Sequence, residues 1–353
     1  MHDVEALTEF EQNCYLAYPH TNGFLSNGQV VFGQQAGDDV NLVRYCPETK
    51  TTQLLRSFTP KDRNPSEQFL WFDVARETDD VAVNAGHGVY RFSGLINEPD
   101  TSPRIAENPA PPNGGQLPSI TDDGARILFE SRLDEQFGAW QVDVASGKTQ
   151  KLVQLPWHAN HFHHCPHDER WIAFSHEGAA PTIMDRVWGW HGEDAPTGCC
   201  LFDQTGSSLL FGHERWCFHR TSCVVVAYGE SPGGPRGVYF CSPGGAQPKL
   251  ISEGDRDWHV NISTDGQWLV TDTTGPHDAP GRGWENAGST SDILLINATT
   301  GERTFVARSR KGDTHPRHPH PAFSPDARWI YFNEADESGA LNRVCRVRNP
   351  FVS

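Results

Sequence analysis

Seven copies of one short pattern, a tight polar turn followed by an apolar run, are spread along the chain. The apolar runs are centred near Val30, Val81, Leu128, Ile172, Val225, Leu269 and Ile330. Several runs are followed, across a loop, by a second short strand and another polar turn, as in GVYRFS and DILLINATTGE. Units with centres roughly 45 to 60 residues apart have the size expected of propeller blades.

The repeat predicts an all-β protein, a seven-bladed β-propeller that occupies residues 1–353 as a single domain. The sheet of one blade cannot bury both of its faces alone, so neighbouring blades stack in a ring. The N-terminal segment, about residues 1–24, is expected to supply a strand that closes this ring, with Cys14 to Phe24 as its candidate. Two β-sandwiches are the alternative, but they would not predict seven similar units.

The charge and the cysteines limit the partners and the compartment. A formal net charge of -16 without a Lys/Arg cluster argues against a nucleic acid or an anionic membrane as partner. The nine cysteines form no CxxC pair, and no leader segment or long apolar run is visible. We therefore expect a cytoplasmic protein with reduced thiols. Neither charge nor composition indicates an oligomeric state.

Histidines carry the strongest chemical signal. His315, His318 and His320 lie in HPRHPHP, directly before the turn of the last unit. The alternating prolines are expected to hold this stretch extended, so that the side chains of His318 and His320 point the same way. His259 occupies the equivalent place one unit earlier. These four imidazoles predict a site for a borderline divalent metal such as manganese, iron, nickel or zinc. A Pro/His-rich surface loop is the alternative.

Further histidines precede other units at similar offsets. They are His20, His161 and His213, and a second cluster, HANHFHHCPH, surrounds His161. Because stacked blades bring equivalent positions together around the axis, we expect these side chains to ring one end of the central channel. For any single histidine, a core or loop imidazole with a satisfied hydrogen bond is the alternative.

Several motifs together resemble the oligogalacturonate lyases, polysaccharide lyase family 22. They are HPHPAFSPD (318–326), HEG with a following RVW (176–178 and 186–188), HERW (213–216), WHVNISTDG (258–266) and HTNGFLSNG (20–28). The second and third units match only as a generic repeat. The resemblance implies a seven-bladed propeller that cleaves galacturonate disaccharides by β-elimination, with manganese held by three histidines and one glutamine.

Carried over motif by motif, the resemblance assigns residues of this chain. The three histidine ligands fall on His259, His318 and His320, and the glutamine position falls on His315. This departure leaves zinc, nickel or iron as alternatives to manganese. The resemblance places the general base at His213 and the arginine that contacts the carboxylate at Arg186.

The chemistry fits these residue types. Elimination removes a weakly acidic proton next to a carboxylate, so a metal and Arg186 would neutralise that carboxylate, and neutral His213 would accept the proton. We expect His161 or His176 to protonate the leaving oxygen. His20 and Trp216 are candidates for substrate binding, although Trp216 is equally well explained as a core residue.

The expected partner is an acidic oligosaccharide. A lyase acting on a glucuronate-bearing glycan is one alternative. A non-catalytic propeller in which the metal only stabilises the fold is the other, and it predicts no turnover.

Overall fold

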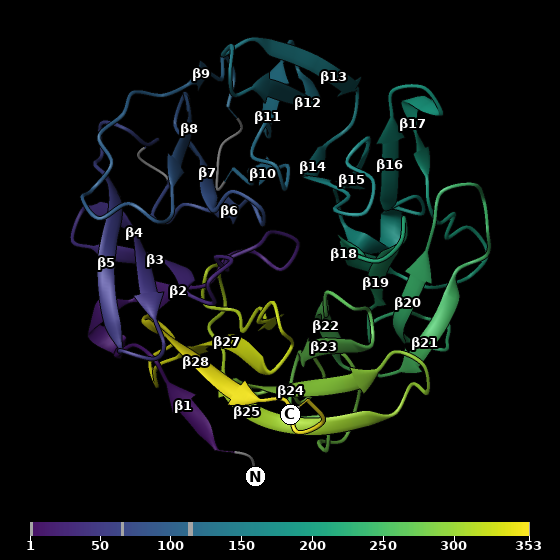
Figure 1. Cartoon of the computed structure of the whole chain (residues 1–353). Coiled ribbons are helices and arrows are strands. Elements are labelled where there is room, and N and C mark those ends of the chain that lie inside the picture. Colours follow the sequence, from purple (N-terminus) through teal and green to yellow (C-terminus); the bar gives the residue numbers. More distant parts are fainter. Residues whose placement is uncertain (1–2, 65–66, 112–115, 353) are drawn as a thin grey trace.

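The computed structural model describes residues 3–64, 67–111 and 116–352. Within these ranges, seven four-stranded antiparallel sheets are arranged around a central axis (Figure 1). The prediction of an all-β, seven-bladed propeller is confirmed. The helical content is limited to two 3-10 turns, η1 (Phe10–Gln12) and η2 (Ala180–Thr182), in the described part of the chain.

Each blade runs from an inner strand near the axis to an outer strand at the rim. The first three blades comprise β2 (Cys14–Tyr15), β3 (Val30–Ala36), β4 (Asp39–Cys46) and β5 (Thr51–Phe58); β6 (Phe72–Val74), β7 (Asp80–Ala85), β8 (Gly88–Ser93) and β9 (Ala106–Glu107); and β10 (Ser119–Ile120), β11 (Arg126–Leu133), β12 (Gln136–Asp143) and β13 (Thr149–Leu155). The fourth and fifth comprise β14 (Ala159–His164), β15 (Trp171–His176), β16 (Val187–His191) and β17 (Ala195–Cys200); and β18 (Phe211–Trp216), β19 (Cys223–Ala227), β20 (Gly237–Cys241) and β21 (Lys249–Glu253). The sixth and seventh comprise β22 (Asp257–Ile262), β23 (Trp268–Thr273), β24 (Thr290–Asn297) and β25 (Arg303–Arg310); and β26 (Ala322–Phe323), β27 (Trp329–Ala335), β28 (Asn342–Arg348) and β1 (Val4–Ala6).

The seven apolar runs of the sequence are the second strands of the blades, namely β3, β7, β11, β15, β19, β23 and β27. A second strand has sheet neighbours on both sides and a neighbouring blade against each face, so its side chains are apolar on both faces. Every residue of β19 is buried, for example. The short strands that the sequence predicts after several of these apolar runs, such as GVYRFS, are the third strands of their blades.

The N-terminal segment contributes two strands. β1 pairs with β28, with Val4 opposite Val347 and Ala6 opposite Cys345, and thereby completes the last blade. Cys14 and Tyr15 instead form the inner strand of the first blade, paired with β3. The strand that joins the two chain ends therefore comes from residues 4–6, earlier than the expected Cys14 to Phe24.

The core lies between adjacent blades rather than in one central layer. Between the fourth and fifth blades, for example, Trp171, Phe211, Trp216 and Val225 belong to one buried cluster. All nine cysteines are free thiols, and six of them are buried. In the described ranges, no helix has the length and apolar character needed to cross a membrane.

Candidate metal and active site

Three of the predicted histidines lie at equivalent irregularities of the inner strands. The ladders of β14, β18 and β22 shift register around His161, His213 and His259. A bulge of this kind bends the strand and redirects a side chain. His161 and His213 also have left-handed backbones, with φ of 60° and 56°, a conformation that is uncommon for residues with a side chain and is concentrated at functional sites.

In the seventh blade, His318 and His320 precede the inner strand β26. The expectation that the prolines hold this stretch extended is wrong, because His315 and Pro316 lie in a turn and His320 has φ of 46°. Asn333 fixes the stretch instead, since its side-chain amide donates to the carbonyls of Pro316 and His318 at 3.2 and 3.0 Å. Two histidines two residues apart converge through a turned backbone, with ring centroids 5.5 Å apart.

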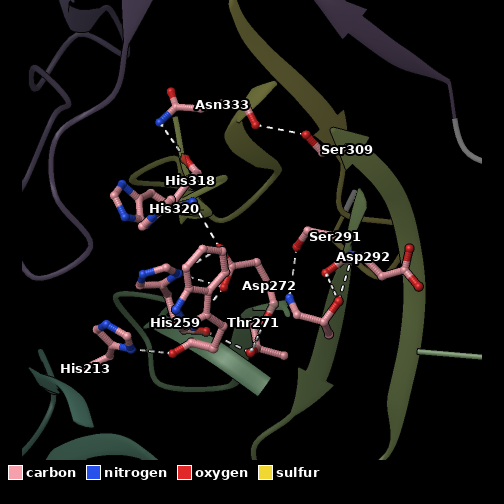
Figure 2. Close-up of polar contacts among 12 residues, drawn as sticks. His213, His259, Thr271, Asp272, Ser291, Asp292, Ser309, His318, His320 and Asn333 are labelled. Carbon is pink, nitrogen blue, oxygen red and sulfur yellow. Dashed lines mark hydrogen bonds and ion pairs between the residues drawn. The ribbon is translucent and has the colours of Figure 1, made fainter. Parts of the chain in front are cut away.

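The side chains of His259, His318 and His320 lie close together (Figure 2). One ligand nitrogen from each of the three lies within 4.8 Å of the others. His259 Nε2, His318 Nδ1 and both ring nitrogens of His320 are buried and have no hydrogen-bond partner in the described residues. A buried polar atom without a partner costs about 1–3 kcal/mol. These buried nitrogens therefore remain available to coordinate a ligand such as a metal ion, because no hydrogen bond within the described residues occupies them.

Burial keeps these imidazoles uncharged. It lowers the pKa of His318 to about 2, and it lowers the pKa of His259 and His320 well below the ordinary value. A metal binds the neutral imidazole, so protons do not compete with it near neutral pH.

Asp272, on β23, orients the cluster. The backbone N–H of His259 donates to its carboxylate at 2.7 Å, and His259 Nδ1 lies 2.9 Å from both carboxylate oxygens. The backbone N–H of His320 donates to the same carboxylate at 3.2 Å. With Nδ1 bound in this way, His259 presents Nε2 to the other two histidines, an arrangement common behind metal-binding histidines.

His315 lies next to this group but is not one of the three converging ligands. Its ring centroid is 4.2 Å from that of His318 and 5.0 Å from that of His320. Its Nδ1 is buried and has no hydrogen-bond partner within the described part of the chain, and burial lowers the pKa of His315 to about 4. A role as fourth ligand stays a prediction.

His213 stands beside the metal-ligand candidates, with its ring centroid 4.2 Å from that of His259. Its Nδ1 donates to the carbonyl of Trp258, which leaves Nε2 free to accept a proton. The Tyr228 hydroxyl lies 3.2 Å from the same Nδ1. Burial lowers the pKa of His213 to about 3, so the ring is neutral.

Arg186 is the arginine that the resemblance assigned to the substrate carboxylate. Its guanidinium pairs with Glu177 at 2.8 Å, and its Nε is buried with no hydrogen-bond partner among the residues that the structure describes. Burial is the largest cause that lowers the pKa of His161 and of His213, and the positive charge of Arg186 is a further cause. The positive charge of Arg186 thus disfavours the protonated forms of both histidines.

Tyr18, which the sequence reasoning missed, links the fourth blade to the seventh. Its ring centroid lies 5.1 Å from that of His161 and 5.1 Å from that of His320. His20 lies 4.8 Å from Tyr18 and stacks on His163 at 4.4 Å. A buried tyrosine surrounded by histidines has no motif of its own, and the only available signal was its place two residues before His20.

Two buried carboxyls support His161. Its backbone N–H donates to Glu130 at 2.9 Å, and its Nδ1 lies 4.0 Å from Glu214. The hydroxyl of Ser175 donates to Glu214. Burial raises the pKa of Glu214 to about 7 and that of Glu130 to about 8, so both carboxyls carry a proton for part of the time near neutral pH.

His176 and Trp216 are not part of this cluster. His176 Nδ1 lies 2.9 Å from Asp185, and its ring packs 4.1 Å from Trp157. Trp216 is only 1% exposed and belongs to the core between the fourth and fifth blades. It lines, together with His20, a cavity of about 40 Å³, which is too small for a sugar. Trp216 is therefore a core residue, the alternative to its predicted role in substrate binding.

A second group with possible metal ligands, His277, Asp278 and Asp292, has a different character. The guanidinium of Arg308 contacts Asp292 at 2.6 Å and Asp278 at 2.8 Å. Arginine already neutralises these carboxylates, so the group is explained as an ion-pair network.

Comparison with known proteins supports the resemblance. No family model matches the chain. It is 24% identical over 211 residues to the oligogalacturonate lyase of Dickeya dadantii (strain 3937), which is 57% of this chain and 53% of that protein. It is 24% identical over 209 residues to the oligogalacturonide lyase of Pectobacterium atrosepticum, with the same shares. The chain thus spans about half the length of the curated relatives that it matches.

Solved structures extend the likeness to nearly the whole chain. An oligogalacturonate lyase in complex with manganese superposes with a TM-score of 0.80 at 18% identity, covering 99% of this chain and 94% of that one. An oligogalacturonate lyase from Vibrio parahaemolyticus superposes with a TM-score of 0.82 at 16% identity and the same coverage. At such low identity these structures establish the fold. The resemblance to the oligogalacturonate lyases is therefore confirmed, in sequence over about half of the chain and in fold over almost all of it.

Proposed function

We propose that the protein is a metal-dependent lyase that cleaves oligogalacturonate-like acidic oligosaccharides by β-elimination. The observation that carries the proposal is the convergence of His259, His318 and His320, with their unpartnered nitrogens, beside neutral His213. The oligogalacturonate lyases found by sequence and by fold favour the same substrate class.

The three histidines fit a divalent metal, because they offer buried, neutral imidazole nitrogens that no group in the described ranges satisfies. His315 is the proposed fourth ligand. Manganese is the first candidate, since a related structure is a manganese complex, while an all-imidazole set also suits zinc, nickel or iron. A metal held there would supply positive charge beside the uronate carboxylate and act as a Lewis acid.

The residues of the chain supply the remaining roles. Arg186 would bind the uronate carboxylate and lower the cost of the charge that develops when the neighbouring carbon loses its proton. His213 Nε2 would take that proton, because Nδ1 is engaged with the Trp258 carbonyl. A bound anionic sugar would raise the pKa of this buried ring and make it a stronger base.

The departing oxygen needs a proton. As the C5–H electron pair forms the C4–C5 double bond, the C4–O4 bond breaks and O4 is protonated. Of the two expected donors, His161 is favoured over His176, because its ring lies in the cluster and 4.0 Å from Glu214. Glu214, whose pKa burial raises to about 7, would be the reservoir for that proton.

The test is turnover, followed by the ultraviolet absorbance of the conjugated double bond that elimination creates. Digalacturonate and a glucuronate-containing oligosaccharide are each incubated with manganese-loaded protein and with protein treated with chelator. We expect a metal-dependent rise with digalacturonate. A rise only with the glucuronate-containing oligosaccharide would mean that the substrate is a glucuronate-bearing glycan. If metal is bound and neither substrate gives a rise, the proposal is contradicted.

A further inference from the structure

An exposed tryptophan stands next to the proposed metal site. Trp284 lies in the loop 274–289, which joins β23 to β24, and is 50% exposed. Its ring meets that of Trp258 edge-on at a centroid distance of 5.0 Å. Trp258 in turn lies 4.2 Å from His318 and 4.5 Å from His259. One aromatic ring therefore separates a free indole surface from two proposed metal ligands.

The loop holds this indole in a fixed place. The buried guanidinium of Arg256 donates to the carbonyls of Pro280, Gly283 and Glu285 at 2.7, 2.8 and 2.8 Å. The backbone N–H of Trp284 donates to the carboxylate of Glu230 at 3.1 Å. An exposed aromatic side chain on a loop fastened by so many hydrogen bonds is preorganised, which reduces the entropy that a ligand must offset on binding.

A cation lies against the same indole. The ammonium of Lys311 is 5.1 Å from the Trp284 ring centroid and donates to the carbonyl of Gly288 at 2.8 Å. Lys311 is only 8% exposed, and no ion pair joins it to a carboxylate in the described ranges. Burial lowers the pKa of Lys311, and the charges of Asp313 and Asp272 only partly offset this from beyond ion-pair distance. A buried ammonium with no carboxylate in direct contact is stabilised when an anion binds beside it.

We propose that Trp284 and Lys311 form the binding subsite for the second sugar of an acidic oligosaccharide. The indole would stack on the apolar face of the sugar ring, and the ammonium of Lys311 would pair with the carboxylate of that sugar. The inference rests on the proposed function, because it takes the first uronate to lie at the metal site. It predicts that the protein binds a disaccharide or longer chain in preference to a single uronic acid, and an acidic chain in preference to a neutral one.

The experiment measures binding apart from turnover. Manganese-loaded protein carrying His213→Ala, so that ligand is not consumed, is titrated calorimetrically with monogalacturonate and with digalacturonate. Trp284→Ala and Lys311→Met are added separately to this background. We expect each to weaken digalacturonate binding by about tenfold or more, a factor that corresponds to ~1.4 kcal/mol, and to leave monogalacturonate binding unchanged.

Phe351→Ala is the matched control. Phe351 is 55% exposed and stacks on Trp268 at 4.9 Å, at the C-terminal end of the chain. The subsite would be overturned if Trp284→Ala and Lys311→Met bind digalacturonate as tightly as Phe351→Ala does. It would also be overturned if these two variants lose as much affinity for monogalacturonate as for digalacturonate. If the unmutated protein binds digalacturonate but does not cleave it, the proposed lyase fails, while the binding comparison still decides the subsite.

Discussion

The imidazole of His259 and the carboxylate of Asp272 form a buried pair, in which Nδ1 lies 2.9 Å from both carboxylate oxygens. The pair determines which nitrogen of His259 faces His318 and His320. Asp272 also accepts the backbone N–H groups of His259 and His320, so one side chain on β23 ties the sixth blade to the seventh.

Asp272→Asn tests this relationship. An amide cannot accept from three donors as a carboxylate does, so we expect metal affinity to fall about 10- to 100-fold, the usual effect of losing such a partner. Equilibrium dialysis at a series of manganese concentrations measures the metal affinity of each variant. Asp73→Asn is the control, because Asp73 is also buried and accepts backbone N–H groups of Asn22 and Ile120. Equal affinity in both variants and in the unmutated protein would contradict the role of Asp272.

Arg186→Lys tests how the uronate carboxylate is bound. Lysine keeps the charge but cannot offer two parallel N–H donors, so kcat/KM is expected to fall about 10- to 100-fold. Steady-state kinetics on digalacturonate measures this change. Arg343→Lys serves for comparison, because Arg343 also pairs with a glutamate, Glu334 at 2.6 Å. A normal rate for Arg186→Lys would show that the guanidinium does not contact the substrate.

Glu130 gives a prediction about pH and stability. Burial raises its pKa from 4.5 to about 8. Between these values the folded state holds a proton that the unfolded state has lost, so the free energy of unfolding falls as pH rises, by up to ~1.4 kcal/mol per pH unit. The favourable contribution is complete below the unfolded pKa and is lost as pH passes the folded value.

We expect Glu130→Gln to reduce this fall in stability, because the amide does not titrate. Urea unfolding at several pH values across that window measures it. Glu135→Gln provides the control, since the side chain of Glu135 is 85% exposed on the same blade. A pH profile for Glu130→Gln that matches the unmutated protein would mean that Glu130 titrates normally.

Trp216 and Trp284 should respond in opposite ways to truncation. Trp216 is buried in the core, so Trp216→Ala is expected to lower the free energy of unfolding by about 3–5 kcal/mol. Trp284 is half exposed, so Trp284→Ala should change stability little while weakening oligosaccharide binding. Urea unfolding and calorimetric titration of both variants separate the two roles. A stable Trp216→Ala protein with impaired sugar binding would restore the substrate-stacking role.

The propeller could be predicted because its second strands are buried on both faces and are therefore apolar runs, such as CVVVA in β19. The inner strands could not be recognised in the same way. β2, β10 and β26 have only two residues each, and β14 and β22 carry polar residues because they face the channel. The recurrence of histidine marked the positions of β14, β18, β22 and β26, and no comparable signal marked β6 or β10.

The site was predictable by residue type and less by geometry. His259, His318 and His320 were found from motif and position, yet the left-handed backbone that turns His320 inward contradicts the extended chain inferred from its prolines. His161 and His176 were indistinguishable in sequence, although one lies in the cluster and the other pairs with Asp185. Asp272 and Tyr18 belong to no motif, since a buried acid and a buried tyrosine gain meaning only from the side chains that the fold brings to them.

The most direct test of the account compares the manganese-loaded protein with its His213→Ala variant on digalacturonate, with metal content determined on the same samples. We expect the unmutated protein to generate the absorbance of the conjugated double bond and to lose it on chelation. The variant should keep its metal but react about 100-fold or more slowly, because the base is missing. A variant as fast as the unmutated protein, or an unmutated protein that holds metal and leaves the substrate intact, would contradict the account.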